Sequence, residues 1–290
     1  MNSNNSIIKH KLNGIVADRV SQLHDAPQTL FYLGADPNEL LQGPSVAIVG
    51  SRKMTPYGHA VTTKLATDLT RAGVTVVSGL ALGVDAAAQR AVVAAGGKTI
   101  AVLAGGLDAI HPASHAGLAR QIVDLGGVLA SEYTVGVPAH KSQFIARNRL
   151  VAALADAVII TEAAIKSGSL HTADFALDLG KPICAVPGPI TSNTSQGTNQ
   201  LLKNGAHVIA CAQDVLDILG IGPLTSKQQT IFGLNPQQMK ILSLMQTGVN
   251  KSEELYAKAG MNESDFAQAL TMLEIHGHIR SLGSSNWQLL

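Results

Sequence analysis

The 290-residue chain has few aromatic and few charged residues. Aromatic side chains make up 3% of the chain, which argues against a sandwich or barrel with aromatic core layers. Charged residues make up 14%, against roughly 25% in an average domain. Because 46% of the residues are hydrophobic, this low charge excludes a mostly disordered chain.

The sequence also lacks an excess of charge of one sign, clustered cysteines and long apolar runs. The net charge of +1 provides no global attraction for nucleic acid or anionic lipid, so any anion must be bound in a local pocket. Cys184 and Cys211 have neither metal nor redox spacing, which suits a reducing compartment. No apolar run approaches 18 residues, and the polar start has no signal-peptide pattern. We therefore expect a cytoplasmic protein without a membrane partner.

Short apolar segments alternate with helical stretches of about 10–15 residues, a pattern that indicates βαβ units. The expected strands cover residues 46–49, 74–77, 99–103, 128–130, 157–161, 183–186 and 206–210. Such alternation predicts an α/β fold, with a mostly parallel sheet covered by helices on both faces. Glycine and polar clusters follow nearly every strand, so they should line the carboxyl edge of the sheet, where open α/β sheets bind ligands.

The pattern changes at both ends of this region. Residues 1–43 read as a short N-terminal extension with a helix and a turn, and residues 44–222 as the sheet domain. Residues 223–234 read as a polar linker. Residues 235–290 predict three helices and a hairpin, an order typical of a small winged helix-turn-helix domain.

Two segments carry candidate anion-binding chemistry. Residues 46–58 form a strand, a glycine turn and a helix start, which either cradle a phosphate together with Arg52 or make a plain βα turn. Residues 140–149 interleave Lys141, Arg147 and Arg149 with Phe144. Cations and a stacking ring suit single-stranded nucleic acid, and the alternative is a solvated basic loop with Phe144 in the core.

The remaining polar clusters are weaker candidates. Ser167, Gly168 and Ser169 open a helix, with Ser169 either a structural N-cap or part of a second phosphate cradle. Catalysis by Glu132 or Glu162 is disfavoured because no nucleophile or metal set accompanies them. His111 and His115 have i,i+4 spacing, but Pro112 between them favours a helix start over a metal site. We expect no catalytic residue and no metal.

Several motifs taken together resemble the DNA-processing protein A (DprA/Smf) family. The matching segments, in chain order, are VAIVGSR with T-x-YG (46–58), VSGLALGVD (77–85), TIAVLAGGLD (99–108), GGVLASEY (126–133), F-x-x-RNR (144–149), SGSL-x-TA (167–173), AVPG (185–188) and S-x-G-x-NxLLxxGA (195–206). The sequence departs from the family pattern at several positions, among them His111, where Tyr is usual, and Ile145, where Pro is usual.

The resemblance implies an extended Rossmann-like, doubly wound domain that binds single-stranded DNA without a cofactor. It also implies a homodimer that loads the recombinase RecA onto incoming strands during natural transformation. The family's DNA contacts fall on Arg52, Lys141 and Phe144. By position, the resemblance adds five residues to the same pocket, namely Ser51, Arg147, Arg149, Gly168 and Ser169.

Two other functions stay open at this point. The first is a nucleoside-monophosphate phosphoribohydrolase using the same sheet edge, although Phe175 stands where that class carries its catalytic Glu. The second is a winged-helix transcription regulator. Residues 225–290 hold five basic and five acidic side chains, whereas a duplex-binding domain normally has a basic face. We therefore expect this tail to contact protein rather than to be the main DNA site.

Overall fold

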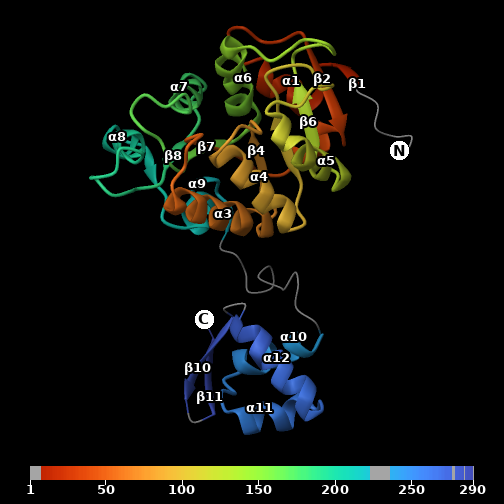
Figure 1. The fold of residues 1–290 in the computed structure, drawn as a ribbon, viewed down its shortest axis with the longest axis vertical. Helices are drawn as coiled ribbons and strands as arrows, with labels where there is room; N and C mark the ends of the chain where they lie inside the picture. The colour runs from red at the N-terminus through yellow and green to blue at the C-terminus, as the bar shows by residue number, and fades with distance from the viewer. Residues whose placement is uncertain (1–7, 223–235, 276–277, 284, 290) are drawn as a thin grey trace. The chain divides into compact units, whose positions relative to one another are not determined.

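The computed structural model describes residues 8–222, 236–275, 278–283 and 285–289. The chain divides into two compact units, Met1–Thr225 and Ser226–Leu290 (Figure 1). No helix among the described residues is long and apolar enough to cross a bilayer.

The first unit is built on a nine-stranded sheet in the order β1-β2-β6-β5-β4-β3-β7-β8-β9. Seven of these strands, β3 to β9, are parallel to one another, which confirms the predicted mostly parallel sheet. The strands are β1 (Ile8–Lys11), β2 (Thr29–Gly34), β3 (Ser45–Val49), β4 (Thr75–Ser78), β5 (Thr99–Val102), β6 (Val128–Ser131), β7 (Ala157–Ile160), β8 (Ile183–Ala185) and β9 (His207–Val208).

Helices cover both faces of this sheet, as the doubly wound fold requires. One face carries α1 (Gly14–Val20), α6 (Lys141–Leu154) and α7 (Leu170–Asp178), packed on alternate residues of the central strands. The opposite face carries α3 (Pro56–Arg71), α4 (Val84–Ala94), α5 (Ala116–Asp124) and α9 (Ala212–Ile218). The shorter elements are α2 (Pro37–Leu40), the 3₁₀ turn η1 (Ala113–His115) and α8 (Gln196–Lys203).

The N-terminal segment differs from the expected separate extension with a helix and a turn. Thr29–Gly34 is a strand that pairs antiparallel with β6, so the sheet continues into the first 43 residues. Its side chains alternate between the two sides of the sheet, with Tyr32 in one hydrophobic cluster and Phe31 in another. Burial on both faces explains why an isolated apolar segment forms a strand here.

The second unit contains α10 (Pro236–Gln246), α11 (Ser252–Ala259), α12 (Glu263–Ile275) and an antiparallel hairpin of β10 (Ile279–Gly283) and β11 (Asn286–Leu289). Three helices followed by a hairpin is the predicted order, and the winged-helix assignment stays a prediction. The unit has a core of its own, and the Trp287 indole donates to Ser252 Oγ at 2.7 Å.

Candidate nucleic-acid interface

The strand order places a topological switch point between β3 and β7. From β3 the chain adds β4, β5 and β6 on one side, and α6 then crosses back to β7 on the other side. Ligands of doubly wound sheets bind outside the carboxyl ends of the strands at such a point. The two loops meet there, because the Ser51 backbone N–H donates to the Glu162 carbonyl at 2.7 Å.

The N-terminus of α3 is already occupied by a carboxylate of the protein. Glu162, 1% exposed, accepts through Oε2 from the Thr55 N–H at 2.9 Å and from the Thr55 hydroxyl at 3.2 Å. Gly58 permits this approach, since a Cβ there would overlap Glu162 Oε2. A carboxylate at this position interacts favourably with the helix dipole as a phosphate would, and here it accepts the N–H of the N-cap residue Thr55. At the turn where the sequence left open a phosphate cradle or a plain βα turn, the carboxylate of Glu162 thus occupies the Thr55 N–H and is shielded from solvent.

Three strand-end or helix-start segments converge on the ring of Phe144. The Arg52 guanidinium, from the loop after β3, lies over the ring with Cζ 5.0 Å from the centroid. His111, from the loop after β5, meets the same ring edge to face at a centroid distance of 5.5 Å. Phe144 itself stands in the first turn of α6 and is half-buried. The structure thus brings together Arg52 and Phe144, which are 92 positions apart in the sequence.

The cationic side chains of the loop that carries Arg52 and of the first turn of α6, which carries Phe144, are open to solvent. Arg52 and Lys141 are exposed, and Lys141 is the first residue of α6. Within the described part of the chain, neither forms an ion pair with a carboxylate. Two unpaired cations beside a partly exposed ring are the components of a single-strand site, in which cations meet phosphates and the ring stacks on a base.

Arg147 lies elsewhere than in an open pocket. It is 2% exposed, and its guanidinium donates to the carbonyls of Gly79 and Val102 at the ends of β4 and β5. A Cβ at Gly79 would overlap this guanidinium. Burial lowers the pKa of Arg147 to about 10, opposed by the charge of buried Asp85. Arg147 therefore links α6 to the ends of two strands of the sheet, and its predicted contact with DNA stays a prediction.

The next two residues of α6 tie the helix to further elements. The Asn148 amide donates to the Gly168 carbonyl at 3.3 Å. Arg149, 6% exposed, pairs with Asp25 at 2.9 Å and with Glu132 at 2.6 Å. Both arginines of the RNR run therefore hold α6 in place. The nucleic-acid contacts predicted for Arg147 and Arg149 stay predictions, while both side chains are buried and engaged within the protein.

The turn at residues 167–169 is only partly open. Gly168 is exposed, whereas Ser169 is 9% exposed and its hydroxyl is 2.8 Å from that of Ser167. Ser169 stands at the N-cap position of α7, one of the two roles left open for it, but makes no side-chain capping hydrogen bond. Ser51 also has its backbone N–H engaged and its Oγ accepting from Lys53 N–H at 3.1 Å. The nucleic-acid contacts predicted for Ser51, Gly168 and Ser169 stay predictions.

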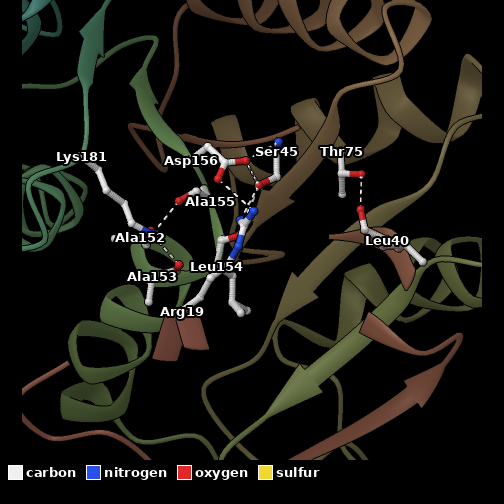
Figure 2. A network of polar contacts seen from close by, with 10 residues as sticks. All are labelled: Arg19, Leu40, Ser45, Thr75, Ala152, Ala153, Leu154, Ala155, Asp156 and Lys181. Atoms are coloured by element: carbon white, nitrogen blue, oxygen red, sulfur yellow. Dashed lines mark hydrogen bonds and ion pairs between the residues drawn. The ribbon is translucent and has the colours of Figure 1, made fainter. Parts of the chain in front are cut away.

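The far end of α6 is held by two more cations, as Figure 2 shows. Lys181 donates to the carbonyls of Ala152, Ala153 and Ala155 at 2.5 to 3.1 Å. Arg19 donates to the Leu154 carbonyl and pairs with Asp156 at 2.8 Å (Figure 2). Burial lowers the pKa of Lys181 to about 8. Cations suit the carbonyls at a helix C-terminus, so α6 is fixed at its end as well as along its length.

The two histidines that share i,i+4 spacing do not share a ligand. His115 is 3% exposed, and its Nδ1 is 2.8 Å from the Leu80 carbonyl, whereas His111 is exposed on Phe144. Among the described residues, no group of three potential ligands could hold a metal ion. Sequence reasoning missed His111 as part of the site, because no local pattern predicts a contact with a ring 33 positions away.

The fold and this edge define an α/β protein with a Rossmann-like sheet and a cationic aromatic site at its switch point. The family described as DNA recombination-mediator protein A matches residues 15–220, and the chain belongs to that family. Protein Smf of Escherichia coli is 35% identical over 266 residues, covering 89% of this chain and 71% of that protein. DNA processing protein DprA of Streptococcus pneumoniae is 40% identical over 197 residues, covering 68% of each chain.

Solved structures of the same family share the fold. DNA processing protein A of S. pneumoniae superposes with a TM-score of 0.67 at 36% identity, covering 74% of this chain and 75% of that one. The Helicobacter pylori protein also gives a TM-score of 0.67, at 37% identity, covering 76% of this chain and 98% of that one. That structure was described for its single-stranded DNA binding mode.

Proposed function

We propose that this protein is a recombination mediator that binds single-stranded DNA at the β3–β7 edge. Arg52 and Lys141 meet successive phosphates, and Phe144 stacks on a base between them. The observation that carries this proposal is the Arg52–Phe144 contact at 5.0 Å, with Arg52 and Lys141 exposed and, among the described residues, in no ion pair with a carboxylate. Support also comes from the family, which includes a structure described for its single-stranded DNA binding mode.

The finer parts of the proposal follow from the same family. We propose that the protein acts as a homodimer and delivers the bound strand to RecA during natural transformation. Two sites on one strand would raise the avidity through effective concentration. A test is the single-strand-dependent ATPase activity of RecA on DNA coated with a single-strand-binding protein. We expect stimulation by the wild type and none by Arg52→Ala. Stimulation by Arg52→Ala equal to that of the wild type would contradict the link between the site and delivery.

The binding site itself is tested by equilibrium titration of a labelled oligonucleotide, single-stranded or duplex, over a salt series. We expect tight binding of the single strand and weak binding of the duplex. Each phosphate neutralised contributes about −0.7 to the log–log salt slope, so Arg52→Ala should flatten the slope by about 0.7. The matched control is Arg120→Ala, because Arg120 is an exposed arginine on α5 without a described ion pair. Equal slopes for Arg52→Ala and the wild type would refute the site.

The structure does not favour the phosphoribohydrolase alternative. Phe175, in place of the catalytic Glu of that class, packs against the hydrophobic core below α7. Glu132 is held by Arg149, and Glu162 is held by Thr55. We therefore propose a binding protein rather than an enzyme. Release of base from purine monophosphates by the purified protein would contradict this proposal.

A further inference from the structure

The loop after β5 adds a third side chain to the ring of Phe144. His111 is exposed and meets that ring edge to face, with an interplanar angle of 62°. An edge-to-face aromatic pair contributes beyond its buried area and fixes the orientation of both rings. Arg52 covers part of the same ring, so the imidazole and the guanidinium flank the surface on which we propose a base stacks.

We propose that His111 is a further contact for single-stranded DNA and binds the nucleotide next to the one stacked on Phe144. This inference rests on the proposed function. An exposed imidazole offers a flat π-face for a neighbouring base, and in its protonated form it carries two N–H donors and a charge for a phosphate. Histidine is the side chain whose charge changes near neutral pH. The contact therefore makes DNA affinity depend on pH, which a site of Arg, Lys and Phe alone would not show.

The sign of this dependence follows from the negative charge of the bound phosphate. Arg52 faces the same ring from the loop after β3, and His140 and Lys141 begin α6 one turn before Phe144. Asp108 stands on the same loop as His111, and its Oδ1 accepts from the Gly136 N–H at 2.9 Å. A phosphate bound beside the imidazole favours its protonated form. By linkage, DNA binds more tightly as the pH falls.

The test measures the affinity for a labelled single-stranded oligonucleotide at about pH 6 and about pH 8, at constant ionic strength. We expect the wild type to bind several-fold more tightly at the lower pH, with a salt slope steeper by about 0.7. His111→Gln should lose this gain. His111→Phe keeps an aromatic ring, so at the higher pH it should bind DNA as tightly as the wild type does. It should not bind more tightly at the lower pH, because its ring cannot be protonated. The control His207→Gln removes an exposed histidine of β9 and should behave as the wild type.

The outcomes separate this inference from the proposed site. If Arg52→Ala and Phe144→Ala weaken binding but His111→Gln matches the wild type at both pH values, His111 is not a contact and the proposed site stands. If all three variants bind as the wild type does, the site itself is wrong. If the pH dependence persists in His111→Gln and disappears in His140→Gln, the titrating contact is His140 and the inference fails.

Discussion

Replacing Arg147 by methionine tests whether the RNR run supports α6 or contacts DNA. The substitution keeps an unbranched apolar stem but removes the guanidinium that binds the Gly79 and Val102 carbonyls. It also leaves Asp85, 6% exposed, without its compensating charge. Removing one partner of a buried charge pair costs about 3–5 kcal/mol. For a unit of this size, we expect the melting temperature to fall by about 6 to 20 °C.

The assay follows unfolding by far-UV circular dichroism and by tryptophan fluorescence on the full chain. Trp287 is the single tryptophan and lies in the second unit, so its transition should stay in place while the transition of the sheet unit falls. The double variant Arg147→Met with Asp85→Asn removes the uncompensated carboxylate and should recover part of the loss. An Arg147→Met protein that melts like the wild type but binds DNA as weakly as Arg52→Ala would refute the structural role.

The pH dependence of the single variant provides an independent check. Burial raises the pKa of Asp85, and the nearby Arg147 charge opposes the rise. Without Arg147, the folded-state pKa of this carboxyl moves further above that of the unfolded chain. The folded state then binds the extra proton, so the stability deficit should shrink as the pH falls through the folded-state pKa and grow as the pH rises. A deficit that is constant over this range would show that Asp85 is not the group left uncompensated.

Three further predictions concern other parts of the chain. Gly58→Ala should displace the Glu162 carboxylate from the N-terminus of α3, and its cost should be non-additive with that of Glu162→Ala by about 0.5–3 kcal/mol in urea unfolding. Lys181 has its pKa lowered to about 8 by burial, so its folded state releases a proton before the unfolded state does. The stability of the wild type relative to Lys181→Met should therefore rise with pH above about 8, and an unchanged difference would contradict this. Deleting 226–290 should leave single-strand affinity unchanged, and its loss would place the main DNA site in the neutral tail.

The sheet could be predicted because its signal is local. The parallel strands β3 to β8 are short, mostly buried apolar runs, each followed by a glycine or polar cluster, and the helices between them show the helical spacing of apolar residues. Thr29–Gly34 does not stand in such an alternation of strands and helices, and its partner strand β6 lies about 100 positions away in the sequence. Only the tertiary pairing shows that it belongs to the sheet.

The site was predicted less completely, for a geometric reason. Residues 141–149 read as one basic segment with an aromatic residue, but they form a helix that begins at the exposed carboxyl edge and runs into the protein. Lys141 and Phe144 stand in the first turn, and Arg147 and Arg149 stand one turn deeper, where they are buried. Composition cannot distinguish a cation that meets solvent from one that meets backbone carbonyls, because depth along the helix axis decides between them.

The carboxylate of Glu162 at the start of α3 has a consequence for competition inside a cell. An open helix N-terminus at the switch point of a doubly wound sheet is a general receptor for the phosphates of small nucleotides. Here that receptor is permanently occupied by a side chain that cannot diffuse away. A nucleotide phosphate would have to compete with this carboxylate for the Thr55 N–H, whereas the exposed side chains of Arg52 and Lys141 form no ion pair with it. We therefore expect free nucleotides to compete poorly with a single-stranded oligonucleotide at this edge of the sheet.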